Sequence, residues 1–344
     1  MSVPRSSRPI LSAAALTAAC ALFAIQATAQ DAKSYYKDKT VKIIVGFGPG
    51  GGYDAYARIM APEFKKALGA NVIVENQPGA GGLSALNRLY VAPPDGQQMM
   101  LIQGTGAAMQ QLLGQEAVRF DLAKFGYLGI VSASPWMWLV KPTSTLKSPA
   151  DAMKPGVKLV WPASGLIDGL GDGAAITCHT LKLDCKIVRG YKGSSAAALS
   201  LTQGETDALY VSDTSADNYV RAKGAKAIAA MGREKSRFFK DTPTIFEAVK
   251  LTPEQQWWFD FRATLDKLGR VLVVPPGLPK ERLEFLQATA RTVLTDPQFV
   301  ESANKKKRYV EFVDPETTKK MMLDVISNIS PEKKAEVRKV ILGK

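Results

Sequence analysis

Histidine and cysteine are scarce in this sequence: its 344 residues include one histidine, His179, and three cysteines. No CxxC or HxxxH spacing occurs, so a metal centre built from these ligands is not expected. No GxSxG turn occurs either, and a hydrolytic triad would be limited to His179, which disfavours a hydrolase. We therefore predict a protein with no metal, no cofactor and no enzymatic activity.

Long hydrophobic runs are also scarce. The only one is LSAAALTAACALFAI, which follows Arg5 and Arg8 and precedes the triplet Ala27-Thr28-Ala29. A charged start, a short apolar stretch and an A-x-A site are typical of a cleaved secretory signal, here residues 1–29. We expect the mature chain to begin at Gln30 and to act in the periplasm.

Acidic residues are outnumbered, and the net charge is +13, of which the signal's two arginines account for two. The basic residues are dispersed, and the only run is Lys-Lys-Lys-Arg at 305–308. An exported chain with dispersed charge is not expected to bind nucleic acid, whereas its basic surface favours acidic ligands.

Two cysteines remain after the signal, Cys178 and Cys185, both in the segment CHTLKLDC. This segment joins the end of a predicted helix to the start of a predicted strand, and an oxidising compartment permits a disulfide. Either the two form a disulfide or they remain two buried thiols.

Strands that alternate with helices predict an α/β fold. Residues 41–45 form a β-branched apolar run typical of a buried parallel strand, and a glycine-rich loop and an amphipathic helix follow it. Residues 71–75 and 99–103 repeat the plan. The 315 residues after position 29 exceed what one core usually serves, which favours two lobes.

Three loops follow these strands: GFGPGGG at 46–52, NQPGAGG at 76–82, and Gly104-Thr105-Gly106. Loops after parallel strands meet at one sheet edge, where backbone N–H groups and helix N-termini bind anions. Asp54 is either the N-cap of the first helix or a ligand acceptor, and Tyr53 either stacks on a ligand or packs on its own lobe. The candidate binding residues here are Gly50, Gly51, Gly52, Tyr53, Asp54, Ala80, Gly81, Gly104 and Thr105.

A dinucleotide-binding enzyme is the alternative interpretation of the first loop. Gly46-x-Gly48-x-x-Gly51 formally matches GxGxxG, and Glu75 ends the next strand, where a ribose-binding acid would sit. The extra glycines and Pro49 are atypical of that motif, and the chain is exported.

The stretch VKLVWPASGLIDGLGDGAA at 157–175 repeats the plan of VKIIVGFGPGGGYDAYA at 41–57. This echo predicts a second, similar lobe that faces the first across a cleft. We predict that lobe 1 comprises residues 30–136 and 263–344 and that lobe 2 comprises 137–262. The candidate binding residues of lobe 2 are Ser164, Gly165, Asp168, Tyr191 and Asp213, of which the two aspartates are either exposed helix caps or ligand contacts.

Several motifs together resemble the extracytoplasmic solute receptors of tripartite tricarboxylate transporters, also called Bug proteins. They are VKIIVGFGPGGGYDAYAR, VIVENQPGAGG, PPDG, the ASG loop at 163–165, RGYKGSSAAALSLTQGETDALY, DTPTIFEA and PPGLPKERLEFLQ, and they cover nearly the whole mature chain. The resemblance implies a two-lobed periplasmic binding protein of the Venus flytrap type II class, in which each lobe is a mostly parallel sheet flanked by helices.

The resemblance also implies a ligand and partners. The ligand would be a tricarboxylate, dicarboxylate, aromatic carboxylate or acidic amino acid, and membrane subunits of the transporter would receive it. The alternative is a sensing receptor without a dedicated transporter. We expect a monomer. Amides and helix ends can hold a carboxylate without an arginine.

The sequence departs from the family pattern at the expected cleft. Tyr53 stands where threonine or serine is usual, and the histidine that usually follows the ASG loop is absent. The stretches at 212–217 and 257–270 also fit the pattern poorly. The family's usual ligand is therefore not transferred to this chain.

Overall fold

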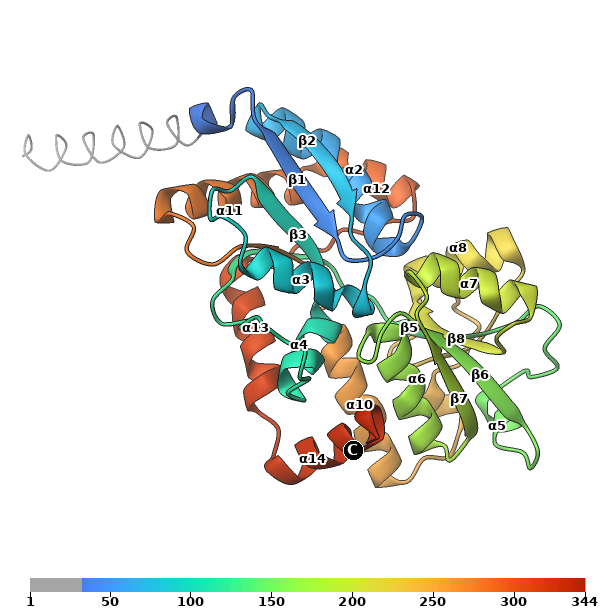
Figure 1. Ribbon diagram of the computed structural model, residues 1–344. Helices are drawn as coiled ribbons and strands as arrows, with labels where there is room; N and C mark the ends of the chain where they lie inside the picture. The colour runs from blue at the N-terminus through green and yellow to red at the C-terminus, as the bar shows by residue number, and fades with distance from the viewer. Residues whose placement is uncertain (1–32, 344) are drawn as a thin grey trace, which may run out of the picture.

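Two lobes, each built on its own β-structure, make up residues 33–343, which a computed structural model describes (Figure 1). The predicted signal, residues 1–29, lies outside this range. No helix between residues 33 and 343 is both long and apolar enough to cross a membrane.

The sheet of lobe 1 has the strand order β2-β1-β3-β10-β4. β1 pairs in parallel with β2 and β3, whereas β10 runs antiparallel to β3 and β4, so that four of the five strands point the same way. The strands are β1 (Thr40–Val45), β2 (Asn71–Asn76), β3 (Gln98–Gln103), β4 (Gly126–Ser132) and β10 (Arg270–Val274).

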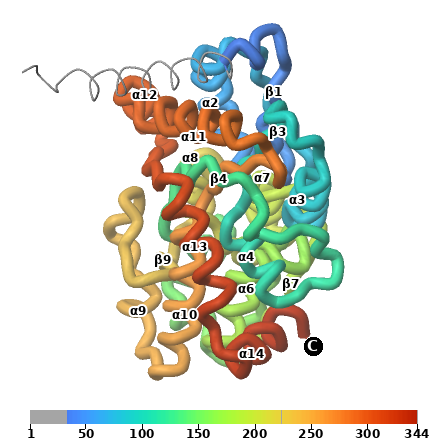
Figure 2. The backbone as a smooth tube through the Cα atoms, turned by 90° about the vertical axis from the view of Figure 1, so that its left-hand side faces the viewer, coloured from blue at the N-terminus to red at the C-terminus, as the bar shows by residue number. Residues whose placement is uncertain are grey.

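Helices cover both faces of this sheet because alternate side chains of β1 enter two cores. Val41, Ile43 and Val45 are buried with α2 and α11, whereas Ile44 is buried with α3, α4 and α13. Figures 1 and 2 show α11 and α13 on these opposite sides. The helices of lobe 1 are α2 (Gly52–Leu68), the 3-10 turn η1 (Ala80–Gly82), α3 (Leu83–Tyr90), α4 (Gly104–Leu112), α11 (Lys280–Thr295), α12 (Pro297–Lys305), α13 (Pro315–Ser327) and α14 (Pro331–Leu342).

Lobe 2 holds a three-stranded sheet, β8-β5-β9, and a parallel pair, β6-β7. β5 runs antiparallel to both of its neighbours. The strands of lobe 2 are β5 (Trp136–Val140), β6 (Lys158–Ala163), β7 (Asp184–Arg189), β8 (Ala208–Ser212) and β9 (Lys226–Ala230). Its helices are α5 (Pro149–Ala152), α6 (Gly169–Thr180), α7 (Ser194–Gln203), α8 (Asp213–Lys223), α9 (Ile245–Ala248) and α10 (Pro253–Asp266).

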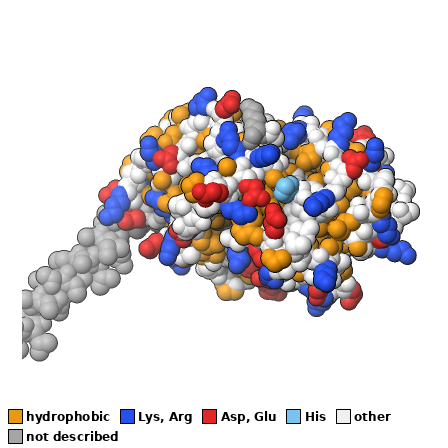
Figure 3. Space-filling view, turned by 90° about the horizontal axis from the view of Figure 1, so that it is seen from below, with side chains coloured by type: hydrophobic (Ala, Val, Ile, Leu, Met, Phe, Trp, Pro, Cys, Tyr) orange, Lys and Arg blue, Asp and Glu red, His pale blue; other side chains and the backbone are white. Residues whose placement is uncertain are grey.

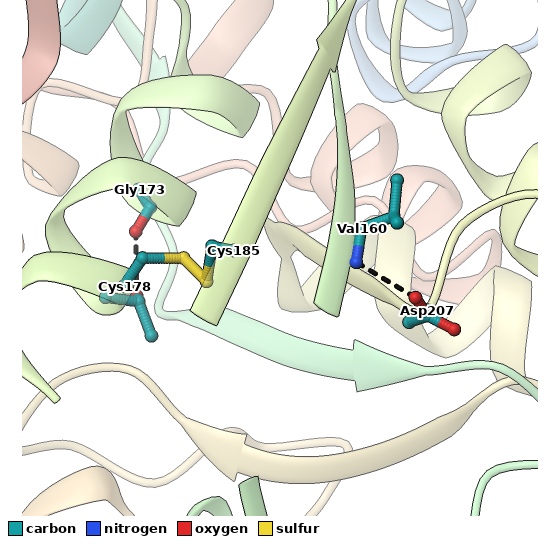
Figure 4. Close-up of a disulfide and its surroundings, with 6 residues drawn as sticks. Val160, Gly173, Cys178, Cys185 and Asp207 are labelled. Atoms are coloured by element: carbon teal, nitrogen blue, oxygen red, sulfur yellow. Dashed lines mark hydrogen bonds between the residues drawn. A yellow bond between two sulfur atoms is a disulfide. The ribbon is translucent and has the colours of Figure 1, made fainter. Parts of the chain in front are cut away.

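Two hydrogen bonds join β6 to the chain that leads into β8. The N–H of Asp207 donates to the carbonyl of Val160 at 2.8 Å, and the N–H of Val160 donates to the Asp207 carboxylate at 2.9 Å (Figure 4). Lobe 2 thus has the order β7-β6-β8-β5-β9, which repeats β2-β1-β3-β10-β4 of lobe 1. The two sequence stretches that echo each other, β1 with α2 and β6 with α6, occupy the same place in each lobe.

The chain crosses between the lobes twice, after β4 and after α10. β5 begins at Trp136, which pairs with Ser212 of lobe 2. In α10, Trp258 packs into the core of lobe 1 and Phe259 into that of lobe 2. The division at 136/137 and 262/263 stays a prediction, with α10 shared between the two cores.

Cys178 and Cys185 form a disulfide, with an S–S distance of 2.11 Å and 6.2 Å between the Cα atoms (Figure 4). The bond fastens the last turn of α6 to the start of β7. Helix α6 begins at Gly169, within the stretch 157–175 that echoes the first strand, loop and helix.

Candidate functional site

The loops that follow β1 and β3 of lobe 1 face those that follow β6 and β8 of lobe 2 around a cavity. Five predicted residues line it, Gly51, Gly52, Tyr53, Thr105 and Ser164. The other lining residues are Phe47, Gln103, Ser134, Trp136, Leu170, Ser194, Val211, Ser212, Ser215, Gly269 and Arg270. The predicted placement of a cleft at the carboxyl ends of the strands agrees with this geometry.

A second cavity lies beside the first, between the loop after β2 and the loop after β7. The predicted residues Ala80, Gly81, Ser164 and Tyr191 line it, together with Gly46, Phe47, Pro78, Gly79, Gly190 and Lys192. Ser164 and Phe47 belong to both cavities, so the two spaces adjoin.

The N-terminus of α2 points at the first cavity. Gly51 is the N-cap of α2, and no side chain caps the helix. The free N–H groups of its first turn and its positive end can therefore bind an anion. The absence of side chains at 51 and 52 lets lobe 2 approach. A Cβ at Gly52 would lie 2.7 Å from Oγ of Ser215 and 3.0 Å from Nη2 of Arg270, and one at Gly51 would lie 3.2 Å from Oγ of Ser194.

Hydrogen bonds between the lobes hold the structure closed. The N–H of Gly48 donates to the Lys192 carbonyl at 2.5 Å, and Nε2 of Gln110 donates to the Ile167 carbonyl at 2.9 Å. Oε1 of Gln103 accepts from the N–H of Gly169 at 2.6 Å. These bonds join the loops of the two lobes around the cavity and must break when the lobes separate.

Arg270 is a cavity residue that the sequence interpretation missed. It opens β10 and is only 3% exposed. Its Nη2 donates to Oγ of Ser212 at 3.1 Å and to Oγ1 of Thr214 at 3.3 Å, both on lobe 2. The guanidinium carbon lies 4.4 Å from the ring centre of Tyr56 and 5.1 Å from that of Tyr53. The sequence analysis expected a cleft that holds a carboxylate by amides and helix ends alone, but an arginine also lines the cavity.

Tyr53 packs on its own lobe and also lines the cavity. Its ring centre lies 5.1 Å from that of Phe47, and its hydroxyl donates to the Gly269 carbonyl at 3.4 Å. Burial raises the pKa of Tyr53 to about 12, although Arg270 acts in the opposite direction, so the phenol stays neutral.

Asp54 is not the N-cap of α2, contrary to the cap interpretation. The helix starts two residues earlier, and Asp54 sits in its first turn, 4% exposed. Its carboxylate accepts from the N–H of Gly50 at 2.9 Å and pairs with Arg58 at 2.9 Å. Burial raises the pKa of Asp54, but the hydrogen bonds from Arg58 and Gly50 outweigh it and lower the pKa. Asp54 stabilises the loop from outside the lining of both cavities.

Asp168 and Asp213 are fully buried rather than exposed. Asp168 is the N-cap of α6, and its two oxygens accept from the N–H groups of Gly171 and Ser164, each at 2.9 Å. Asp213 is the first residue of α8, and its Oδ2 accepts from the Ser236 hydroxyl at 3.0 Å. Neither side chain lines a cavity. Burial raises the pKa of each aspartate, against these hydrogen bonds.

Three predicted glycines also lie outside the cavity linings. The N–H of Gly50 is engaged by Asp54, and that of Gly104 donates to the Gly269 carbonyl at 2.9 Å. Gly165 faces the other lobe directly, and a Cβ there would lie 2.6 Å from the carbonyl carbon of Ala80 and 2.7 Å from the nitrogen of Gly81. Gly165 therefore permits closure rather than supplying a free donor.

A buried charge cluster ties α10 to α6 behind the cavity. Arg262, 1% exposed, lies 3.1 Å from Oδ1 of Asp172 and contacts Oδ1 of Asp266. Burial raises the pKa of Asp172 to about 6 and that of Asp266 to about 7, although Arg262 lowers both. One guanidinium neutralises only one of the two carboxylates, so the pair of aspartates favours retention of a proton near neutral pH.

The dinucleotide interpretation of the glycine loop finds no support in Glu75. Its carboxylate pairs with Lys42 at 2.9 Å and accepts from Gln77 at 2.7 Å. Within residues 33–343, no group of three or more His, Cys, Asp or Glu side chains could hold a metal ion.

Two lobes of equal strand order, with loops from both around a cavity, define a periplasmic-binding-protein fold. The chain belongs to the tripartite tricarboxylate transporter family receptors, whose family model matches residues 56–331. Proteins of this family are solute receptors and not enzymes.

Relatives of known sequence and structure agree with this assignment. A UPF0065 protein of Bordetella pertussis is 26% identical over 273 residues, covering 77% of this chain and 80% of its own. The periplasmic binding protein BugD shares the fold with a TM-score of 0.74 at 20% identity, over 89% of this chain and 98% of its own. MatC from Rhodopseudomonas palustris, solved with malate, has a TM-score of 0.70 at 21% identity, over 88% and 99%. A second R. palustris protein, solved with adipate, has a TM-score of 0.73 at 18% identity, over 87% and 97%.

Proposed function

We propose that this receptor works in the periplasm, where it captures a small carboxylated metabolite between its lobes and delivers it to the membrane subunits of a tripartite tricarboxylate-type transporter. The observation that carries the proposal is the uncapped N-terminus of α2, which faces a cavity enclosed by both lobes. Helix ends and backbone N–H groups bind carboxylates well when water is excluded.

Relatives support the chemical class of the ligand. MatC was solved with malate and the second R. palustris protein with adipate, and both ligands are small carboxylates. The predicted export signal at residues 1–29 supports the periplasmic location. Figure 3 shows basic and acidic side chains interspersed on the lower face, a pattern that gives no single-sign patch for nucleic acid there.

A thermal-shift panel of monocarboxylates, dicarboxylates, tricarboxylates and acidic amino acids tests capture. A ligand at about 100 times its dissociation constant stabilises the folded protein by roughly 2.7 kcal/mol, which raises the melting temperature by several degrees. Small-angle scattering with the best ligand should then show a more compact particle. No shift with any carboxylate, or an unchanged radius at saturation, contradicts the proposal.

Delivery needs a separate experiment. Cells that express the receptor together with the membrane subunits should accumulate the labelled ligand, and cells that lack either component should not. Uptake that does not depend on the receptor would contradict delivery and favour a sensing role for the receptor.

A further inference from the structure

We propose that Arg270 is the counter-charge for a single ligand carboxylate, so that the receptor prefers a small monocarboxylate with an apolar body over a di- or tricarboxylate. This inference rests on the proposed function and specifies the ligand class of the same cleft.

Arg270 is a buried cation without an acidic partner. Among residues 33–343, no carboxylate lies within ion-pair distance of its guanidinium, whereas the equally buried Arg262 pairs with two aspartates. Its Nε is buried and makes no hydrogen bond to another described residue. The polar partners of Nη2 are neutral hydroxyls, those of Ser212 and Thr214.

An unpaired buried charge costs several kcal/mol of folding free energy, so a protein retains one where a partner arrives later. A carboxylate would complete the pair, because a guanidinium offers a planar fork of donors that matches two carboxylate oxygens. The position suits this role, since Arg270 lines the cavity beside the open N-terminus of α2, with its Nη2 3.0 Å from where a Cβ on Gly52 would lie.

The charges around the cavity match one carboxylate. Arg270 is the only side chain with a full charge among the described residues that line the first cavity. On lobe 2 the buried Asp168 already caps the N-terminus of α6, whereas α7 and α8 begin at the cavity without a side-chain cap and offer backbone dipoles but no full charge. The walls include apolar side chains suited to a hydrocarbon or aromatic body, namely Phe47, Tyr53, Trp136 and Leu170.

Matched ligand pairs test the preference. Hexanoate and adipate share a six-carbon chain, and benzoate and terephthalate share a ring, but the second member of each pair carries an extra carboxylate. Titration calorimetry on the wild-type chain should give at least roughly tenfold tighter binding for one of the monocarboxylates than for its partner, because the second charge would be buried without a counter-ion. Tighter binding of adipate and terephthalate would overturn the single-carboxylate inference.

Substitution of the arginine tests its role. Arg270→Met should weaken binding of the preferred monocarboxylate by roughly 100-fold, and Arg270→Lys by roughly tenfold, because lysine keeps the charge but loses the fork. The matched control is Arg308→Met. Arg308 is a half-buried arginine that donates to the Thr214 carbonyl at 3.3 Å but does not line the cavity, and its replacement should change the dissociation constant less than about threefold.

Thermal melts without ligand separate a binding role from a structural one. If Arg270 serves the ligand, Arg270→Met removes an uncompensated buried charge and should melt no lower than the wild type. A lower melting temperature with unchanged ligand affinity would assign Arg270 to the fold and overturn the inference while leaving the proposed function intact. A wild-type chain that binds none of the four probes and no other carboxylate would overturn both.

Discussion

Closure of the lobes can be tested at Gly165, because a side chain added at this position would meet the opposite lobe. A Cβ at position 165 would lie 2.6, 2.7 and 2.8 Å from three backbone atoms of Ala80 and Gly81, and its φ angle is one that alanine accepts. Gly165→Ala therefore fits the open form but forces the lobes several tenths of an ångström apart in the closed one.

Overpacking of this kind costs about 1–3 kcal/mol, and here the cost falls on the closed state alone. The apparent affinity scales with the population of the closed form, so the dissociation constant should rise roughly 5- to 150-fold. The melting temperature of the unliganded variant should stay close to that of the wild type.

Titration calorimetry and thermal melts of the variant measure both quantities. The matched control is Gly232→Ala, whose added Cβ would meet only the Cβ of Ala263, at 3.5 Å, an ordinary contact. Unchanged affinity in Gly165→Ala, or a loss of stability without ligand, would refute the reasoning that the two lobes meet at this loop when the ligand is held.

Two further predictions concern stability. Reduction of the disulfide, or the double change Cys178→Ala and Cys185→Ala, frees a short loop in the unfolded chain. Denaturant titrations should then give a free energy of unfolding about 2.5 kcal/mol lower. An unchanged midpoint would show that the disulfide does not stabilise the fold. The folded-state pKa values of Asp172 and Asp266 exceed the ordinary aspartate value, so the folded chain retains protons that the unfolded chain releases above pH 4, and stability falls as pH rises toward 7. The free energy of unfolding should be about 4 kcal/mol lower at pH 8 than at pH 5 from this source, and Asp266→Asn should reduce the difference. An equal pH dependence in the variant would contradict the role of the cluster.

Local patterns in the sequence predict the loops of the site but not all of its side chains. The β-branched run of β1 followed by glycines identifies a strand and a loop at its carboxyl end, and the echo at 157–175 identifies the equivalent place in lobe 2. These patterns are local, so the loops can be predicted from them without knowledge of the fold.

Features that depend on distant contacts were missed or misplaced. Arg270 meets Ser212 across 58 positions of sequence, and its one local signal is a charge that opens the apolar strand VLVV. The sequence alone makes Asp54 a possible N-cap, because nothing local shows that Gly52 and Tyr53 are already helical. The exposure of Asp168 and Asp213 was also mispredicted, since the packing of α6 and α8 against their sheet buries both.

A crystal structure with the tightest-binding carboxylate tests the central claim most directly. The lobes should enclose the ligand, with its carboxylate at hydrogen-bond distance from the amides at the start of α2 and from Arg270, and with Ser164 in contact from the second lobe. A ligand bound outside both cavities, or held by one lobe alone, would contradict the account.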